Sequence, residues 1–239
     1  MNRDADEILA VAQVTKRFGG VTAVDGVSFS VYRGAITGLI GPNGSGKTTL
    51  FHLISGVERP DSGRITFKGR PITGLPPHAI NRHGLGRTFQ ITRLFGQMTA
   101  LENLLVGARA RSRTEALDRA RSLLEFVGLE ALAPEYAANL SYGQQKLLEF
   151  VRVLVSDPDL VLLDEPFAGV NPAMEERLVE HMLAMQASGK TFLITDHEMR
   201  LIMALCGRLL VLDHGELIAD GPPAQVREDE RVIEAYFGR

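Results

Sequence analysis

A run of nine residues carries the side-chain and backbone features that bind phosphate groups. It fits the P-loop pattern G-x-x-x-x-G-K-[ST] and reads Gly41-Pro42-Asn43-Gly44-Ser45-Gly46-Lys47-Thr48-Thr49. The glycines at 41, 44 and 46 predict positive φ angles, with N–H groups turned inward around an anion. The Lys47 ammonium suits the β- and γ-phosphates of a nucleotide, and the Thr48 hydroxyl suits Mg²⁺.

The neighbours of this run support that interpretation. Residues 35–40 are apolar and predict a short buried strand, and residues 50–54 continue as a helix that ends near Gly56. The positive end of that helix points at the same anion site. The alternative is a glycine-rich turn between a strand and a helix, which the Lys-Thr pair in register disfavours. The sequence therefore predicts a nucleoside triphosphate site, without saying how the energy is used.

Two adjacent carboxylates follow a second apolar strand. Asp164 and Glu165 come directly after residues 160–163, Leu-Val-Leu-Leu, and before Pro166. In α/β sheets, ligands bind at the carboxyl ends of the strands. We therefore expect Asp164 to hold Mg²⁺ through its shell and Glu165 to orient and deprotonate the attacking water, an effect worth roughly 10²–10⁴-fold in rate. An isolated Asp-Glu pair would be read as the solvated start of a loop.

A further phosphate-binding feature opens a helix far along the chain. In the segment Asn139-Leu140-Ser141-Tyr142-Gly143-Gln144-Gln145, Ser141 stands at the N-cap position of a predicted helix. Such a helix end binds phosphate well. Since the P-loop already holds one triphosphate, this end is most easily used on a nucleotide held by another copy of the chain. An ordinary N-cap is the alternative.

The pattern of apolar residues predicts an α/β fold. We expect a P-loop core with a mainly parallel sheet, an antiparallel β subdomain and an inserted helical subdomain, all in one domain of 239 residues. The core would comprise 1–90 and 157–239, and the helical subdomain about 91–156. Strands are expected over 8–12, 27–31, 35–40, 62–69, 85–89, 160–163, 191–195 and 209–212, with a turn over 16–20 and a hairpin through 213–216 into 217–219. Helices are expected over 77–82, 116–127, 147–155 and 172–186 and near the end of the chain, with Gly128 as a C-cap.

Composition excludes several classes of protein. The net charge of −3 gives no global basic field of the kind that nucleic-acid binders carry. The single cysteine, Cys206, excludes an internal disulfide framework and suits a small buried side chain.

One segment holds a cluster of five arginines: Arg109, Arg111, Arg113, Arg119 and Arg121. A solvated helix start is favoured there over a nucleic-acid or lipid contact. No apolar stretch approaches the roughly 20 residues that span a bilayer, so another chain would supply any membrane spans.

Taken together, these motifs resemble the nucleotide-binding subunits of ABC transporters over essentially the whole chain. The resemblance rests on the order and separation of residues 41–49, Gln90, 140–144, 160–165 and His197. It implies two subunits, identical or paralogous, arranged head to tail with two ATP molecules between them. The P-loop of one subunit and the Ser141, Gly143 and Gln144 region of the other would hold each ATP. Tyr142 departs from the commonest signature, which has glycine there, while Ser141 and Gly143 are kept.

The resemblance also implies roles for single residues. Phe18 would stack on adenine, although a loop aromatic packed on the core is the alternative. Gln90 would reach Mg²⁺ and the attacking water and link the sheet to the helical subdomain. His197, after the strand at 191–195, would contact the γ-phosphate. Residues 168–171 would form the loop that crosses to the partner subunit.

Subfamily features point to ATP-driven import. Residues 18–24, 86–90, 102–107 and 232–238 are similar to those of the ATPases of branched-chain amino-acid importers. The resemblance implies transmembrane permease partners, indirectly a solute-binding protein, no nucleic acid, and a peripheral location at the cytoplasmic face of the cell membrane. A urea importer, a lipopolysaccharide exporter and an assembly factor outside transport remain alternatives. A P-loop kinase is disfavoured by the 140–145 signature.

Overall fold

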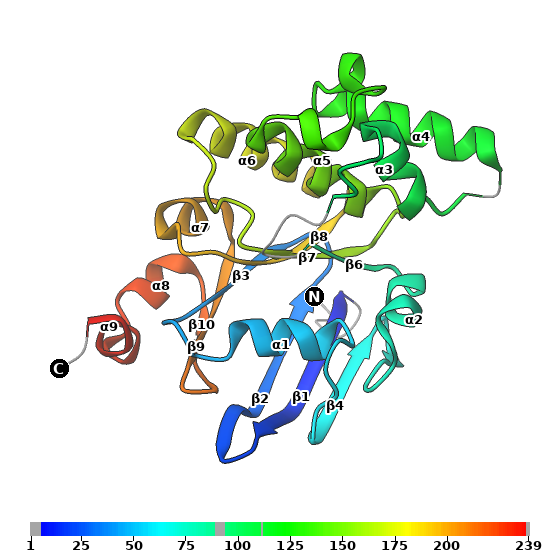
Figure 1. Cartoon of the computed structure of the whole chain (residues 1–239). Helices are drawn as coiled ribbons and strands as arrows, with labels where there is room; N and C mark the ends of the chain where they lie inside the picture. Colours follow the sequence, from blue (N-terminus) through cyan, green and yellow to red (C-terminus); the bar gives the residue numbers. More distant parts are fainter. Residues whose placement is uncertain (1–5, 89–93, 111, 238–239) are drawn as a thin grey trace.

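The computed structural model describes residues 6–88, 94–110 and 112–237. They form two β-sheets with one helix between them and further helices on the far side of the larger sheet (Figure 1). The predicted α/β architecture, with one mainly parallel and one antiparallel sheet, is confirmed by the strand pairings.

The smaller sheet is antiparallel, in the order β2-β1-β4-β5. Its strands are β1 (Glu7–Phe18), β2 (Val21–Tyr32), β4 (Ser62–Phe67) and β5 (Arg70–Pro71). Val27, Phe29 and Val31 are buried on one face of β2, as the alternating sequence predicts. The turn expected over 16–20 is wrong for its first three residues, because β1 continues to Phe18, which pairs with Val21. Gly19 and Gly20 alone make the turn.

The larger sheet has the strand order β10-β9-β3-β8-β7-β6. All neighbouring strands pair in parallel except β10, which returns from β9 as an antiparallel hairpin. Its strands are β3 (Ile36–Ile40), β6 (Leu85–Arg87), β7 (Leu160–Asp164), β8 (Thr191–Thr195), β9 (Arg208–Asp213) and β10 (Glu216–Gly221). Every residue of β3, β7 and β8 is buried, which explains their unbroken apolar sequences.

Most helices lie where periodicity and caps predict them. They are α1 (Lys47–Ile54), α2 (Pro77–Arg82), α3 (Ala100–Gly107), α4 (Arg113–Phe126), α5 (Tyr142–Leu154), α6 (Pro172–Ala187), α7 (Met199–Leu205), α8 (Pro223–Arg227) and α9 (Glu230–Phe237), with 3-10 turns at Glu130–Leu132 and Ala137–Asn139. Gly128, just past α4, has φ +70°, as a C-terminal glycine should. Sequence analysis missed α7, whose seven residues are too few to show a helical period.

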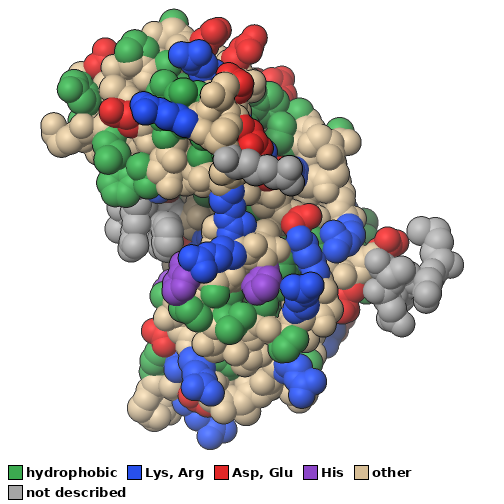
Figure 2. All heavy atoms as spheres, turned by 90° about the vertical axis from the view of Figure 1, so that its right-hand side faces the viewer, with side chains coloured by type: hydrophobic (Ala, Val, Ile, Leu, Met, Phe, Trp, Pro, Cys, Tyr) green, Lys and Arg blue, Asp and Glu red, His purple; other side chains and the backbone are tan. Residues whose placement is uncertain are grey.

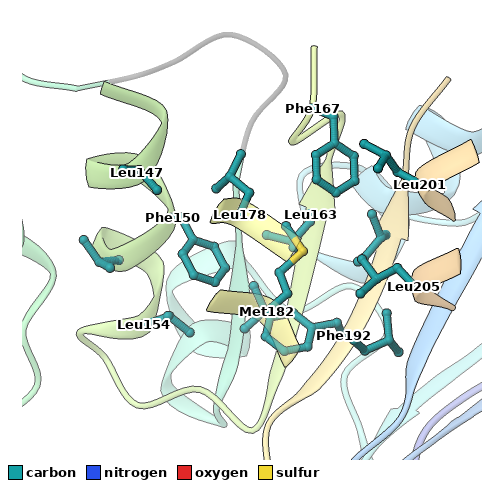
Figure 3. Close-up of a cluster of buried hydrophobic side chains, with 14 of the residues drawn as sticks. Leu147, Phe150, Leu154, Leu163, Phe167, Leu178, Met182, Phe192, Leu201 and Leu205 are labelled. Atoms are coloured by element: carbon teal, nitrogen blue, oxygen red, sulfur yellow. The ribbon is translucent and has the colours of Figure 1, made fainter. Parts of the chain in front are cut away.

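Two buried clusters lie on opposite faces of the larger sheet. Leu160 and Leu162 of β7 face α1 and the smaller sheet, whereas Val161 and Leu163 face the helices α5, α6 and α7. Figure 3 shows the second cluster, in which Phe150 and Leu154 of α5 meet Met182 of α6 and Phe192 of β8. Because helices α3 to α5 share this cluster with the sheet, they are packed on the core rather than tethered to it. The boundaries of a helical subdomain at 91 and 156 stay a prediction.

The helices are all too short or too polar to cross a bilayer, among the residues that the structure describes.

Candidate functional site

The predicted phosphate-binding loop joins β3 to α1 and has the backbone that the sequence predicts. Gly41, Gly44 and Gly46 have φ angles of +150°, +80° and +105°. Gly46 is also the N-cap of α1, with no side chain to bond the helix N–H groups. A Cβ atom on Gly46 would lie 2.3 Å from the Ala23 carbonyl oxygen, so no larger residue fits there. The backbone itself therefore shapes the loop.

Lys47 is held by the loop that it follows. Its ammonium donates to the carbonyl oxygens of Gly41 (2.7 Å) and Pro42 (2.8 Å). Burial lowers the pKa of Lys47, while the carboxylates of Glu165 and Asp164 act to raise it. A partly desolvated ammonium that is held against the backbone of the loop is suited to bind a polyphosphate.

The register of the parallel strands brings distant residues to the same edge of the sheet. Strand β8 lies between β3 and β7, with Gly38 opposite Ile194 and Asp164 opposite Thr195. The carboxyl ends of all three strands therefore meet at the loop. This is the edge at which open α/β sheets bind their ligands.

Glu165 and His197, both predicted to be catalytic, lie in contact. The Nε2 atom of His197 is 2.8 Å from Oε1 of Glu165, and the Glu165 N–H donates to the Thr195 carbonyl oxygen. Glu165 has φ +50°, in the left-handed region that glutamate rarely adopts. Strain of this kind costs about 1–3 kcal/mol and persists where surrounding contacts hold it. The chain thus leaves strand β7 in a bent conformation that turns the Glu165 side chain toward His197.

A hollow of about 420 Å³ lies over the loop. Its lining comprises Ala23, Asn43, Gly44, Ser45, Gly46, Lys47, Thr48, Thr49, Glu165 and His197. Nearly all of the predicted loop residues and two of the three predicted catalytic residues are therefore brought together. The third, Gln90, lies outside the described residues. Gly41 and Pro42 do not line this hollow, but their carbonyl oxygens accept hydrogen bonds from the Lys47 ammonium. Pro42 also lines an adjoining hollow beside α9.

Four of the other predicted site residues lie apart from this hollow. Phe18 is 46% exposed at the end of β1, where the Lys16 ammonium lies 5.1 Å from its ring centroid. Its role in adenine stacking stays a prediction.

Ser141 and Gln144 form a capping box at the start of α5: the Ser141 hydroxyl accepts from the Gln144 N–H, and the Gln144 side chain accepts from the Ser141 N–H. The expected N-cap is confirmed, and its role toward phosphate stays a prediction, as does that of Gly143, which packs against Met174 of α6.

Asp164 is paired with an arginine that sequence analysis did not single out. Arg87 Nη2 lies 2.9 Å from Asp164 Oδ2, and Arg87 Nη1 donates to the Ser55 hydroxyl at 2.8 Å. The two charged side chains are 6% and 3% exposed. The signal was available, since Arg87 ends the strand that was expected to deliver Gln90. One oxygen of the predicted Mg²⁺ ligand is thus bound to a buried guanidinium.

Asp196 is a second residue that sequence analysis missed. Its side chain is buried and accepts from the N–H groups of Phe167 (2.9 Å), His197 (2.7 Å) and Glu198 (3.0 Å). Burial raises the pKa of Asp196, with the three N–H donors acting to lower it and Glu165 acting to raise it. The carboxylate therefore joins the segment after Glu165 to the backbone of His197.

The arginine-rich segment serves several purposes. Arg113, Arg119 and Arg121 lie in α4, which Ser112 caps, and Arg119 forms an ion pair with Asp157 at 2.8 Å. Burial, followed by the nearby charge of Arg82, lowers the pKa of Arg109. In the space-filling view of Figure 2, Lys and Arg side chains gather where the outline of the molecule narrows, between its upper and lower parts. The solvated helix start is confirmed for Arg113 and Arg121, which are exposed, while Arg119, which is 33% exposed, also binds Asp157 beyond α5. Arg111 lies outside the described residues.

No cluster of three or more His, Cys, Asp or Glu side chains that could hold a metal occurs in the described parts of the chain. A metal at the loop would instead have hard oxygen donors, the Thr48 hydroxyl and Asp164, which is the chemistry that Mg²⁺ prefers. Magnesium keeps several waters and takes other ligands from substrate phosphates, so a site with few protein ligands fits it.

Comparison with known families gives two matches. Residues 24–168 match the family described as ABC transporter, and residues 216–239 match one described as branched-chain amino acid ATP-binding cassette transporter. The chain is 41% identical to the high-affinity branched-chain amino acid transport ATP-binding protein LivG of Salmonella typhimurium, over 97% of this chain and 98% of that protein. It is 40% identical to BraF of Pseudomonas aeruginosa, a protein of the same description, with the same coverage.

Solved structures resemble the fold closely. The ADP conformation of an ATP-binding cassette of an ABC transporter superposes with a TM-score of 0.90 at 37% identity, over 98% of this chain and 99% of that one. A dimeric ATP-binding cassette, in a post-hydrolysis state with ADP and phosphate, superposes with a TM-score of 0.80 at 25% identity, over 90% and 99% of the two chains.

Proposed function

This chain belongs to the ABC transporter family and hydrolyses ATP, and we propose that it does so as the ATP-binding subunit of a branched-chain amino acid importer. The observation that carries the catalytic part is the contact of Glu165 with His197 over the P-loop hollow. The names of the relatives and the match of residues 216–239 support the transported solute. That C-terminal match favours a branched-chain amino acid importer over the urea and lipopolysaccharide alternatives.

In this proposal the side chains of the hollow divide the work of phosphoryl transfer. Lys47 and the loop N–H groups hold the β- and γ-phosphates, and Glu165 takes the proton of the attacking water. His197 contacts the γ-phosphate and orients Glu165 through the 2.8 Å contact. Positioning and charge stabilisation supply most of the catalysis, because the protein forms no covalent bond in this reaction.

A magnesium ion would be held by Thr48, Asp164 and Gln90. When bound, it would neutralise charge on the phosphates. Because Arg87 holds Asp164 Oδ2, Asp164 would bind the ion, or a water in its shell, through its other carboxylate oxygen. The Asp164 N–H also donates to the Thr88 hydroxyl at 3.1 Å, so both the backbone and the side chain of Asp164 are fixed.

We further propose that each ATP lies between two subunits, with Phe18 against adenine. The support is that Ser141, Gly143 and Gln144 do not line the P-loop hollow of their own chain, and that Ser141 is exposed at the start of α5. A second subunit placed head to tail would bring these groups to the phosphates. The related cassette that is dimeric with ADP and phosphate is consistent with such a pairing.

The membrane partners follow from the same proposal. Permease subunits would supply the spans and hold this chain at the cytoplasmic face of the membrane, with a solute-binding protein acting on the far side. A hollow of about 260 Å³ separates α2 and β6 from α3 and α5. Its position suits a contact that would transmit closure of the ATP site to a permease.

The catalytic assignment is tested by Glu165→Gln. We expect unchanged ATP binding, turnover reduced by about 10²–10⁴-fold, and a dimer that persists in ATP and Mg²⁺. Phosphate release and gel filtration measure these effects. Glu176→Gln makes the same chemical change on the exposed face of α6 and should behave as wild type. Wild-type turnover in Glu165→Gln would refute the assignment of the base.

The transport role is tested by purification with its partners. We expect the chain to co-purify from detergent-solubilised membranes with a multi-span permease. Proteoliposomes that contain this complex should transport leucine only when ATP is present on the side of the membrane where this chain lies. Recovery with soluble partners alone would favour an assembly factor, and uptake of urea without leucine would overturn the choice of solute.

A further inference from the structure

Tyr142 forms a hydrogen bond that takes no part in the proposed phosphoryl transfer. It is the first residue of α5, at the position where the commonest signature has glycine, and its hydroxyl donates to the Ala168 carbonyl oxygen at 3.0 Å. The two residues are 26 positions apart in the chain. The Lys146 ammonium lies 5.7 Å from the centroid of the Tyr142 ring, which is consistent with a cation–π contact that steadies the ring. The bond therefore joins the start of α5 to the loop after β7.

The loop is shaped to accept this ring. Gly169 has φ +72°, and a Cβ atom placed on it would lie 3.1 Å from the Tyr142 hydroxyl oxygen and 3.3 Å from Cε1. Both the backbone conformation and the adjacent ring thus favour glycine. Next to it, a Cβ atom on Gly143 would lie 2.8 Å from Cε of Met174, so the start of α5 also lies against α6.

The two ends of the loop are held independently of Tyr142. Phe167 is buried in the core cluster and its N–H donates to Asp196, and Asn171 caps α6 through Met174 N–H. Figure 3 shows the Phe167 ring pointing into the cluster beside Leu201. Between these anchors, the N–H groups of Ala168 and Val170 bond only within the turn. Among the hydrogen bonds of the described residues, the one from Tyr142 connects this stretch to another element.

We propose that Tyr142 is a positioning residue that fixes residues 168–171 to the start of α5, so that both segments meet a second copy of this chain as one preassembled surface. The inference rests on the head-to-tail dimer of the proposed function. Both segments are the ones expected to face the partner, and Tyr142 is half-exposed at 49%, on the outer side of the chain. A loop ordered before association loses less conformational entropy when the dimer closes.

Loss of the hydroxyl should weaken closure without altering the nucleotide site of the same chain. One neutral hydrogen bond corresponds to about a two- to tenfold change in an equilibrium constant. We therefore expect Tyr142→Phe, in the Glu165→Gln background, to raise the dissociation constant of the ATP-dependent dimer about two- to tenfold. ATP binding to the monomer should stay unchanged, because the P-loop hollow is untouched. The melting temperature should fall by no more than a few degrees, as expected when one hydrogen bond outside the buried core is lost.

The matched control is Tyr136→Phe. Tyr136 is another half-exposed tyrosine near the start of α5, and no side-chain hydrogen bond is formed by it within the described part of the chain. Sedimentation of the full chain in ATP and Mg²⁺ gives the dimer constants. Hydrogen exchange of the monomer, read on the peptide that spans 166–174, reports the loop directly. We expect faster exchange there in Tyr142→Phe and wild-type exchange in Tyr136→Phe.

The outcomes are separable. Equal exchange and equal dimer constants for the two Phe variants would overturn the role of Tyr142. Faster exchange with an unchanged dimer constant would also overturn it, since the tether would then not serve association. If Glu165→Gln forms no dimer with ATP, the head-to-tail site itself fails, and the exchange comparison alone then shows whether Tyr142 holds the loop.

Discussion

The two halves of the proposed ATP site are built in different ways. The P-loop half is nine consecutive residues between a buried strand and a helix, and its shape is set by backbone angles and by contacts with backbone carbonyls. The other half is assembled from the start of α5 and the loop 168–171, which one tyrosine hydroxyl connects across 26 positions. The backbone thus sets the shape of the first half, because a Cβ atom at Gly46 would clash with the Ala23 carbonyl oxygen. The second half depends on side chains that single substitutions can change.

This difference predicts how each half tolerates change. A substitution in the P-loop should damage the fold of the monomer and nucleotide binding together. A substitution at the start of α5 or in the loop should leave the monomer nearly intact and act when two subunits meet. Single substitutions in each half test this difference.

The largest effect is expected from Gly46→Ala. The added Cβ would lie 2.3 Å from the Ala23 carbonyl oxygen at φ +105°, so overpacking and backbone strain add to about 4 kcal/mol of lost stability. Urea unfolding and fluorescent-nucleotide titration measure the effect, with ATP binding lost at the same time. Gly44→Ala is the control: φ is +80° but no atom lies within 4 Å, so only about 1–2 kcal/mol should be lost. Equal losses would show that sterics do not set this half.

Arg87→Met should destabilise the protein by about 3 kcal/mol, because it leaves Asp164 buried without its guanidinium partner. Arg87 also bonds Ser55 at the end of α1, so the change loosens the link between the P-loop helix and β7. Chemical denaturation measures the loss. In contrast, Arg231→Met removes an ion pair to Asp229 between side chains that are 67% and 23% exposed, and should leave the stability close to that of wild type. A small loss in Arg87→Met would mean that Asp164 finds another partner.

Ser141→Ala should cost about 1 kcal/mol, because the capping box of α5 is removed. Ser141→Asn keeps a capping oxygen and should stay within about 0.5 kcal/mol of wild type. Thermal unfolding distinguishes the two. If the hydroxyl also contacts the partner's nucleotide, both variants should weaken the ATP-dependent dimer of Glu165→Gln by a similar factor. Normal dimerisation in the Asn variant would leave Ser141 as a cap alone.

The smallest effect concerns the attachment of the helices to the sheet. Arg119 and Lys190 hydrogen-bond Asp157 and lower its pKa to about 2, below the usual value near 3.9. A folded pKa below the unfolded one stabilises the protein above the unfolded value, and this contribution is lost as the pH falls toward 2. Since the carboxylate is 58% exposed, Asp157→Asn should cost under about 1 kcal/mol.

Asparagine accepts the φ of +57° at this position, so the Asp157→Asn comparison isolates the charge. Urea unfolding should show a constant difference from pH 7 to about pH 5 that shrinks below about pH 4. A difference that grows as the pH falls would contradict this origin.

Much of the site could be predicted because its parts are local. The positive φ angles of the loop glycines, the strand before them, the cap at Ser141 and the carboxylates after β7 all follow from short stretches of sequence. What was missed is non-local or short. Arg87 meets Asp164 across 77 positions, and α7 is too brief to show a period. The turn at 16–20 was placed too early because β1 continues on ladder bonds to β2 that composition does not reveal.

Short stretches of the sequence suffice to predict that the chain binds nucleotide phosphate and that its core is a parallel sheet, since both depend on backbone freedom and apolar runs within a few residues. Which side chains meet depends on the tertiary structure. The strand register places Glu165 against His197, burial pairs Arg87 with Asp164, and the packing of α5 on α6 puts the Tyr142 hydroxyl on the Ala168 carbonyl. These contacts join elements that are distant in the chain, and their geometry is set by the packing of buried layers rather than by any local pattern.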